Sequence, residues 1–542
     1  RLFYGLLAGS MALTAVARDS VLFLMAWEIM ALAAFFLITT EDADPAACRA
    51  GRIYLIATHL GTAALIALFL LLKRASGSWG LDALPAGALA PGAAAAVFLL
   101  ALVGFGLKAG LMPLHVWLPG AHANAPSHVS ALLSGVMIKM GIYGLIRLTG
   151  LFPAPPAWWG AVLLVLGMVS GVLGVAFAIG QHDLKRLLAY HSIENIGIIA
   201  MGLGLALLGR SASRPDWIAL GFAGALLHVW NHGLFKSALF LAAGSTIHAA
   251  GTREIDHLGG LLRRMPWTGA TFLLGAVAIC GLPPLNGFVS ELLIYLALFR
   301  TLGPDGGQWA AAALAAPALA LIGALAVACF VKVFGVAFLG EPRGPGAERA
   351  EESPLSMLAP MLVLSLLCAL IGLEPALVAP PLARVAEAWS GSPFVRSLPA
   401  LAPFGALSVA GTALLGLLAA GALVVRHWYR GRPLRRAVTW DCGYLAPSPS
   451  MQYTASSFAQ MLVGLFSWAL RPRVERLRPP GLFAPSGSFA SEVPDTVFEG
   501  LVQPAFARFD RLAARLRPVQ HGRTQLYILY ILAAVVALLF WR

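Results

Sequence analysis

Thirteen long apolar runs most constrain the fold of this 542-residue chain. About 20 apolar residues in a helix span the hydrocarbon core of a bilayer, because each residue adds about 1.5 Å along the helix axis. The linkers are short and rich in turn residues, which favours antiparallel packing of neighbouring helices. The sequence therefore predicts an all-α, polytopic transmembrane helix bundle. Its runs cover residues 1–16, 19–39, 52–72, 93–118, 128–149, 158–180, 184–207, 216–244, 268–300, 309–339, 355–377, 403–426 and 525–541.

Composition excludes several classes of function. Hydrophobic residues make up 59% of the chain and charged residues only 12%, and no soluble stretch has the ~100 residues that a nucleotide or flavin domain needs. The net charge of +13 is spread over helix ends and the C-terminal third, not gathered with aromatic residues in a stripe for nucleic acid. The cysteines are scattered without the spacing of a zinc site or an iron–sulfur cluster: Cys48, Cys280, Cys329, Cys368 and Cys442. The sequence predicts no catalytic residue, cofactor or metal on this chain, and no nucleic-acid partner.

The distribution of basic residues predicts the orientation. Loops after even-numbered runs hold most of the lysine and arginine, which places them in the cytoplasm and the chain in the inner (plasma) membrane. These residues are Arg49, Arg52, Lys185, Arg186, Arg253, Arg263, Arg264, Arg343, Arg349 and the cluster between Arg426 and Arg436. Between the last two runs, residues 496–518 have apolar side chains at helical spacing with arginines on other faces. This pattern predicts a lateral amphipathic helix; a disordered basic linker is the alternative.

A short internal echo predicts a structural repeat. Residues 110–114 (GLMPL) resemble residues 281–285 (GLPPL), and both stretches interrupt an apolar run. Proline breaks the helical hydrogen bonding, which a membrane protein tolerates only where protein or water takes over the freed groups. Two such breaks predict two inverted repeats over residues 1–149 and 150–340, with binding sites at the breaks; coincidence is the alternative. Additional helices over 341–440, a cytoplasmic-side linker with the lateral helix over 441–524 and a terminal span over 525–542 complete the predicted domains.

Ionisable residues lie inside the apolar runs. A charge at the bilayer centre costs at least ~2.5–3.5 kcal/mol, so these side chains are expected to face one another within the bundle. A row of them can relay protons, because each site holds or releases a proton according to the charge of its neighbour. The predicted proton-translocation residues are Glu28, Lys108, Lys139, Glu194, His228, His232, Lys236, Glu291 and Lys332.

Other interpretations of these residues remain open. Glu28 and Lys108 suit a structural ion pair, and Lys139 or Lys332 can extend to the headgroups. His228 and His232, four residues apart, also suit zinc or hydrogen bonds between helices. Three further histidines flank the first break, where capping and loop contacts are as plausible as function: His115, His122 and His128.

Long motifs resemble one known family. These are Trp27-Glu28, KAGLMPLHVWLPGAHANAPSHVSALLSGVMIKMGIYGLIRL (108–148), DLKRLLAYHSIENIG (183–197), HVWNHGLFKSALFLAAGS (228–245) and NGFVSE (286–291). Together they resemble the antiporter-like membrane subunits shared by respiratory complex I, Mrp-type sodium/proton antiporters and membrane-bound hydrogenases. WDCGYLAPSPSMQYTASSFAQ (440–460) and QHGRTQLYILYI (520–531) look like the large antiporter-like subunit of hydrogenase-4 and formate hydrogenlyase complexes. Members usually have three further helices before the one that matches the first run here, which suggests a missing N-terminal part.

The resemblance implies roles for five residues. Glu28 and Lys108 match the family's Glu–Lys pair, Lys139 and Lys236 match its relay lysines, and Glu291 matches its terminal charge, where many members have lysine. The implied function is that of a proton-translocating membrane subunit in a redox-driven complex. A Na⁺/H⁺ antiporter subunit of Mrp type, a complex I subunit and a structural scaffold are the alternatives.

The same resemblance implies the partners. These are other membrane subunits of a hydrogenase-like or complex I-like assembly, with peripheral iron–sulfur and nickel–iron redox subunits reached indirectly. The lipid bilayer surrounds the chain, and the transported ion is the proton, with sodium as the alternative.

Overall fold

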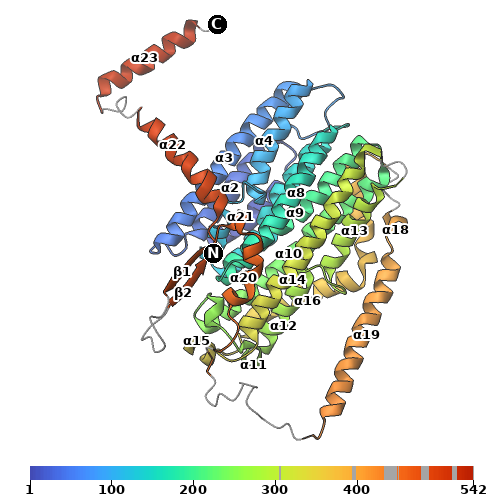
Figure 1. Ribbon diagram of the computed structural model, residues 1–542. Coiled ribbons are helices and arrows are strands. Elements are labelled where there is room, and N and C mark those ends of the chain that lie inside the picture. Colours follow the sequence, from blue (N-terminus) through green and yellow to red (C-terminus); the bar gives the residue numbers. More distant parts are fainter. Residues whose placement is uncertain are drawn as a thin grey trace. The chain divides into compact units, whose positions relative to one another are not determined.

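The computed structural model describes residues 1–303, 307–392, 398–432, 448–449, 451–477, 488–515 and 522–540. The chain divides into two compact units, Arg1–Val493 and Pro494–Arg542. The first unit is a bundle of long helices that run side by side (Figure 1). The predicted all-α membrane class is confirmed.

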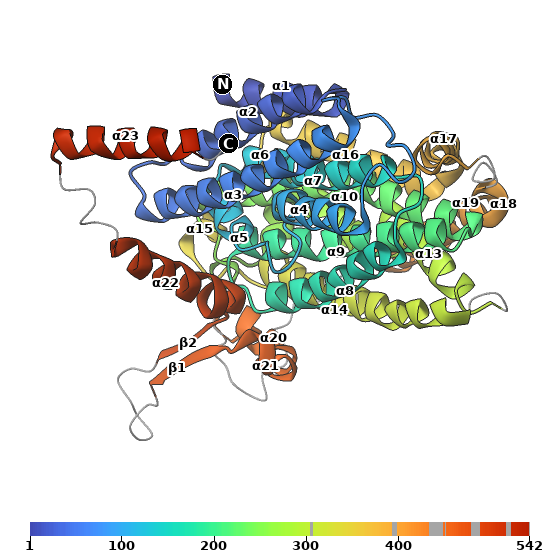
Figure 2. The ribbon, with the colours of Figure 1, turned by 90° about the horizontal axis from the view of Figure 1, so that it is seen from above.

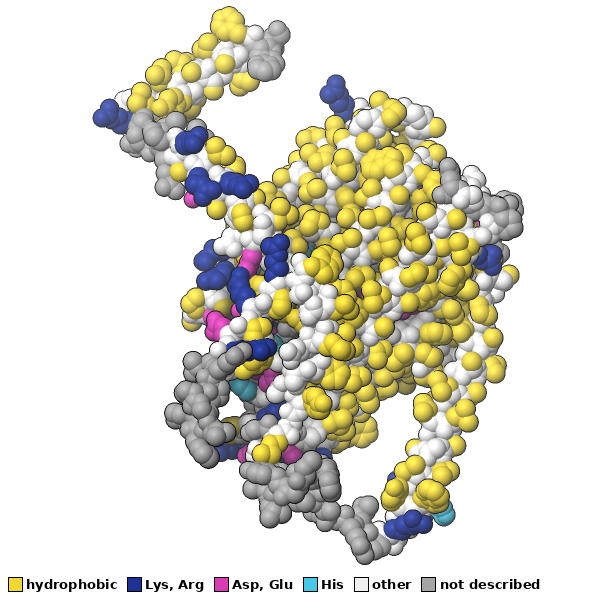
Figure 3. Space-filling view, in the orientation of Figure 1, with side chains coloured by type: hydrophobic (Ala, Val, Ile, Leu, Met, Phe, Trp, Pro, Cys, Tyr) yellow, Lys and Arg dark blue, Asp and Glu magenta, His cyan; other side chains and the backbone are white. Residues whose placement is uncertain are grey.

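Ten helical segments in the described ranges are long and apolar enough to cross a membrane. Hydrophobic side chains cover most of the face seen in Figure 3, as expected for a surface in contact with lipid. The segments are α2 (Ser20–Ile38), α3 (Pro45–Ser76), α4 (Pro91–Ala109), α6–η1–α7 (Ser127–Leu132, Leu133–Met137, Ile138–Gly150), α8 (Ala157–Ile179), α9 (Leu184–Ser211), α10 (Pro215–Ala250), η3–α14 (Gly307–Leu314, Ala315–Phe338), α16 (Leu355–Leu373) and α19 (Phe404–Tyr429).

The other three predicted runs contain shorter helices. The first run is α1 (Leu2–Val16), the ninth divides into α12 (Pro266–Ile279) and α13 (Asn286–Arg300), and the last is α23 (Thr524–Phe540). Short connecting helices that the sequence did not predict separately are α5 (Leu118–Asn124), η2 (Ile255–His257), α11 (Leu261–Arg264), α15 (Pro345–Arg349), η4 (Pro375–Leu377), α17 (Ala379–Ser390) and α18 (Leu398–Leu401).

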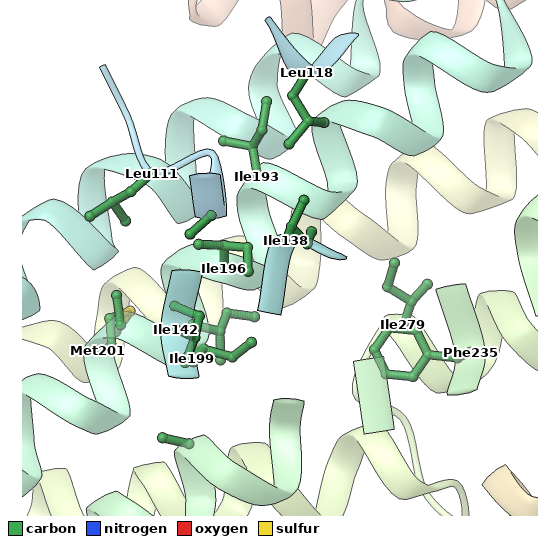
Figure 4. Packing of buried hydrophobic residues seen from close by; sticks show 14 of the residues in the cluster. Leu111, Leu118, Ile138, Ile142, Ile193, Ile196, Ile199, Met201, Phe235 and Ile279 are labelled. Carbon is green, nitrogen blue, oxygen red and sulfur yellow. The ribbon is translucent and has the colours of Figure 1, made fainter. Parts of the chain in front are cut away.

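Helix α9 lies in the interior of the first unit (Figure 2). It packs closely on α8 because glycines face each other across the contact: a β-carbon on Gly167 would lie 2.6 Å from the Gly197 carbonyl oxygen. A β-carbon on Gly160 would likewise lie 2.7 Å from the Gly204 oxygen. In lipid, such small residues let helix backbones approach and gain dispersion contacts. Apolar side chains of α9, including Ile193, pack among those of α7 and the first break (Figure 4).

The two predicted helix breaks are present and have the same backbone pattern. Gly110 and Gly281 both adopt left-handed conformations, with φ of 78° and 61°. The amide that follows each glycine donates to the carbonyl oxygen five residues before it, from Leu111 to Gly106 and from Leu282 to Val277. A turn then closes three residues later, where Leu114 donates to the Leu111 oxygen and Leu285 to the Leu282 oxygen. Protein groups cover freed backbone atoms, because Ser170 Oγ accepts from the Met112 amide at 3.0 Å. The correspondence supports the predicted repeats over 1–149 and 150–340, whose boundaries remain a prediction.

Loops after even-numbered runs meet on one face of the first unit. Arg253 Nη1 donates to the Ala123 oxygen at 2.7 Å, and the Arg253 oxygen accepts from the Leu184 amide at 3.0 Å. The Gly260 amide donates to the Leu339 oxygen at 2.9 Å. The fourth, sixth, eighth and tenth runs therefore end on the same side, as the predicted orientation requires; that this side is cytoplasmic remains a prediction.

The predicted cytoplasmic-side linker over 441–524 contains helices and strands that the sequence did not predict. Helices α20 (Ala455–Leu465) and α21 (Ser467–Leu470) and an antiparallel pair, β1 (Arg473–Leu477) with β2 (Ser488–Glu492), belong to the first unit. The Gln181 side chain donates to the Val493 oxygen at 3.3 Å, which attaches this segment to the end of α8. The WDCGY motif (440–444), with Cys442, lies outside the described residues.

The second unit contains the predicted amphipathic helix as η6 (Phe498–Val502) and α22 (Gln503–Ala514), followed by α23. The alternative of a disordered linker is wrong for these residues, while residues 516–518 of the prediction lie outside the described ranges.

Candidate functional site

The predicted ionisable residues come together from seven helices. Lys108 on α4, Glu194 on α9, Lys236 on α10 and Lys332 on α14 expose 1% or less of their surface, and Lys139, His228, His232 and Glu291 are also buried. Extension of Lys139 or Lys332 to the headgroups is therefore wrong. Glu28 differs from the expectation, because 30% of its side chain is exposed on the flank of α2. On this exposed side, Glu28 Oε2 lies 3.6 Å from His59 Nε2 of α3, which supplies a polar partner for a carboxylate that would be costly in lipid.

Glu28 and Lys108 do not form the direct ion pair that sequence reasoning left open. Hydroxyls of α3 stand between them: Thr62 Oγ1 donates to the Glu28 carboxylate, and Lys108 Nζ donates to Tyr54 Oη at 3.3 Å and Thr58 Oγ1 at 3.4 Å. Tyr54, Thr58 and Thr62 are four residues apart and share one side of α3. These five residues are called the Glu28 segment below. Sequence reasoning missed its hydroxyls, although the Tyr-x₃-Thr-x₃-Thr spacing was a signal.

A larger polar cluster surrounds α10. His228 is hydrogen-bonded through Nδ1 to Ser290 Oγ at 2.9 Å and through Nε2 to Asn195 Oδ1 at 3.0 Å. His228 thus joins α10 to α13 and α9, so the predicted hydrogen bonds between helices are present at this residue. Both ring nitrogens are engaged in these hydrogen bonds, and neither is available to bind zinc. Asn231 Nδ2 donates to the Asn286 oxygen at 2.7 Å, beside the second helix break. In the ranges described, no group of three or more metal-ligating side chains is present.

The lysines and Glu194 bind to backbone and to histidine within the same cluster. Lys139 Nζ donates to the Ser134 oxygen, which is exposed by the π-helical turn η1, and Lys236 Nζ donates to the Leu188 oxygen. Glu194 is hydrogen-bonded to His191 Nδ1. Lys236 interacts electrostatically with both Glu194 and Lys139. Lys139, Lys236, Glu194 and His191, together with His122, His232 and Glu291, are called the α10 cluster below.

Glycines position the two carboxylates of the α10 cluster. A β-carbon on Gly174 of α8 would lie 2.7 Å from the Glu194 amide nitrogen, so the absence of a side chain there lets α9 approach. A β-carbon on Gly281 would lie 2.5 Å from Glu291 Oε2, so the carboxylate rests directly on the broken backbone of the second interruption. The break that the sequence predicted as a binding site thus holds the predicted terminal charge.

Several buried polar atoms of this region have no hydrogen-bond partner within the described chain. They are both ring nitrogens of His122 and His232, His191 Nε2, Glu194 Oε1, Asn231 Oδ1 and both side-chain amide atoms of Asn286. An unsatisfied buried polar atom costs about 1–3 kcal/mol, so a group of them marks a place that ordered water can occupy. The arrangement is suited to passing protons through hydrogen-bonded side chains and water.

The predicted row of ionisable side chains lies in two groups, the Glu28 segment and the α10 cluster, and its role in proton transfer stays a prediction. Tyr54 Oη lies 3.9 Å from Met137 Sδ, a hydrogen bond between the Glu28 segment and the helix that carries Lys139. A thioether sulfur accepts hydrogen bonds only weakly and donates none. At the other end, Lys332 Nζ donates to the Ile179 and Gln181 oxygens at 2.6 and 3.0 Å, at the end of α8.

Comparison with known proteins gives a consistent result. The sequence profile of the family described as NADH:quinone oxidoreductase/Mrp antiporter, transmembrane, matches residues 17–304. Hydrogenase-4 component B of Escherichia coli (strain K12) is 38% identical over 99% of this chain and 82% of its own length. Formate hydrogenlyase subunit 3 of the same organism is 37% identical over 84% of this chain and 73% of its own length.

A solved structure has the same fold. A chain of the membrane-bound sulfane sulfur reductase, an archaeal respiratory membrane complex, aligns with a TM-score of 0.74 at 23% identity, over 99% of this chain and 83% of that chain. The resemblance predicted from the sequence is confirmed.

Proposed function

This chain belongs to the NADH:quinone oxidoreductase/Mrp antiporter family of membrane subunits, and we propose that it translocates protons within a redox-driven complex of hydrogenase-4 or formate hydrogenlyase type. The observation that carries the proposal is the α10 cluster, where buried lysines, histidines and carboxylates lie within electrostatic range of one another. In such a cluster each proton affinity depends on the neighbouring charges, so a charge that arrives at one site moves a proton at the next.

The proposed path runs along Glu28, Lys108, Lys139, Lys236 and Glu291. Lys236 is central, since it interacts with Lys139 on one side and Glu194 on the other. Electrons pass through partner subunits that carry iron–sulfur or nickel–iron centres, and this chain contributes only the protonic part. The complex lies in the inner membrane with the loops after even-numbered runs in the cytoplasm.

The test uses the assembled complex in sealed vesicles. Replacing Lys236 with alanine removes the central charge, so proton pumping per electron pair is expected to fall by at least about tenfold while the redox reaction of the partners persists. Lys73→Ala, at the end of α3 and beside Trp79, is the matched control and is expected to pump normally. Normal pumping by Lys236→Ala contradicts the proposal. Sodium-dependent proton exchange without any electron donor favours the Mrp-type alternative.

A further inference from the structure

A pocket opens beside Lys332 on the face where the even-numbered runs end. It has a volume of about 470 Å³. One wall is α14, with Lys332 and Gly335, and the other is the segment at the start of α20, with Tyr453 and Ser457. Arg343 adds a second cation and is held by the Tyr453 oxygen at 2.8 Å. The pocket is thus formed jointly by a membrane helix and the C-terminal segment that the sequence had suggested to be a linker.

On its inner side, Lys332 reaches the α10 cluster. One turn earlier on α14, the buried Cys329 interacts electrostatically with Lys332, Glu194 and Lys236. The His191 ring, which binds Glu194, interacts with Lys332 and packs on Phe330, with centroids 4.7 Å apart. Lys332 therefore lines the pocket and also acts electrostatically on His191, the partner of Glu194, while its ammonium group is fixed at the end of α8.

On its outer side, Lys332 interacts with Asp256, a half-exposed carboxylate of the loop after α10. Asp256 accepts from the Ala455 amide at 2.6 Å, and its Oδ2 lies 3.5 Å from His182 Nδ1. Burial alone would raise the pKa of Asp256, but the hydrogen bonds from His182 and Ala455, with the charges of His182 and Arg343, lower it below its ordinary value. The carboxylate next to the pocket therefore stays ionised.

We propose that this pocket is an aqueous port through which Lys332 exchanges protons between bulk water and Glu194 of the α10 cluster. The Lys332 ammonium passes a proton inward, toward the Glu194 carboxylate, and the neutral amine that remains takes up a proton from water in the pocket; the ammonium is thereby restored, and no oxidant or other reactant is consumed. This inference rests on the proposed function and adds to it the site at which the proton relay exchanges protons with bulk water. The competing explanation is structural: a cation at the C-terminal end of α8 stabilises the helix by its charge alone.

Arginine at position 332 separates these explanations. A guanidinium keeps the positive charge and the donors for the α8 carbonyls, yet it does not release its proton in proteins. Lys332→Arg is therefore expected to assemble and to keep the redox activity of the complex, while pumping per electron pair falls by at least about tenfold. Normal pumping by Lys332→Arg overturns the port.

Two single cysteine variants test the pocket without a substitution at Lys332. A β-carbon on Gly335 has no heavy atom within 4 Å, and the same holds for Gly323, which does not line this pocket on α14. In vesicles with the port side outward, a cationic methanethiosulfonate reagent is expected to label Gly335→Cys and to reduce its pumping several-fold. The same treatment is expected to leave the pumping of Gly323→Cys and of the parent protein, which has the partly exposed Cys48, unchanged. Gly335→Cys that resists labelling, or that pumps normally once labelled, overturns the port.

Lys236→Ala measured in parallel separates this inference from the proposed function. If Lys236→Ala loses pumping while both the Lys332→Arg and labelled Gly335→Cys complexes keep it, the relay stands and the port is elsewhere. If Lys236→Ala pumps normally, the proposed function itself fails.

Discussion

Replacing Gly281 with alanine tests whether the position of the Glu291 carboxylate governs proton movement. The new methyl group has two effects that can be calculated separately. Gly281 has φ of 61°, a left-handed conformation that costs a residue with a β-carbon about 1–2 kcal/mol. The β-carbon would also lie 2.5 Å from Glu291 Oε2, whereas nonbonded heavy atoms prefer about 3.5 Å. The carboxylate must therefore move by roughly 1 Å, the difference between these distances.

Gly251→Ala is the matched control. Gly251 ends α10 with φ of 69°, and a β-carbon there has no heavy atom within 4 Å. It therefore carries the same backbone cost without moving a neighbour. Both variants are expected to lose about 1–2 kcal/mol of stability. Only Gly281→Ala is expected to lose function, and a misplacement of about 1 Å can reduce a rate about 10²-fold.

The measurement is proton pumping per electron pair in vesicles that contain the assembled complex, together with its thermal unfolding in detergent. Equal unfolding temperatures for the two variants show that the backbone costs match. If Gly281→Ala then pumps as well as Gly251→Ala, the position of the Glu291 carboxylate does not matter, and the assignment of Glu291 to the path is refuted.

Three further outcomes are expected. Thr62→Val removes the hydroxyl that donates to the Glu28 carboxylate, and the loss of this hydrogen bond costs about 1–3 kcal/mol, so proton pumping is expected to fall. Thr62→Ser keeps the hydroxyl and is expected to keep pumping. Gly167→Ala overpacks α8 against α9 and is expected to lower stability by about 1–3 kcal/mol, while Gly416→Ala, which has open space on α19, leaves the unfolding temperature unchanged or raises it. Because the pKa of Asp256 is lowered in the folded protein, its contribution to seating α20 is complete above the ordinary value of about 3.9 and is lost as the pH falls through the lowered value. Limited proteolysis of residues 451–477 is therefore expected to stay constant from neutral pH down to about 4 and to accelerate only at more acidic pH; acceleration near pH 6 contradicts this assignment.

The sequence was most informative where burial in lipid has a high cost. Apolar runs of this length have few alternatives to membrane helices, and every predicted run contains a helix in the described ranges. Likewise, the cost of a charge in lipid predicted that Lys108 and Lys236 turn inward, and both are buried. Glycine and proline together predicted both breaks because few other residues adopt those conformations.

Features determined by tertiary contacts were not visible in the sequence. Tyr54, Thr58 and Thr62 are compatible with a helix surface facing lipid, so only the approach of α4 shows that they bind Lys108. The π-helical turn before Lys139 has no sequence signal distinct from an ordinary helix. RVERL and SFASE resemble charged or polar linker sequence, and their pairing as β1 and β2 depends on seating against the end of α8.

The Glu28 segment and the α10 cluster also differ in how far their polar atoms are hydrogen-bonded within the protein, and this difference affects how a proton could pass from one to the other. In the Glu28 segment, Lys108 and Glu28 are connected through α3 hydroxyls that already have partners. In the α10 cluster, several polar atoms lack protein partners and suit water. Between them stands the contact of Tyr54 with Met137, and a thioether cannot donate a proton onward. The hydrogen bond from Tyr54 to Met137 therefore does not itself carry a proton from Lys108 toward Lys139, and we expect ordered water to complete this part of the proposed path.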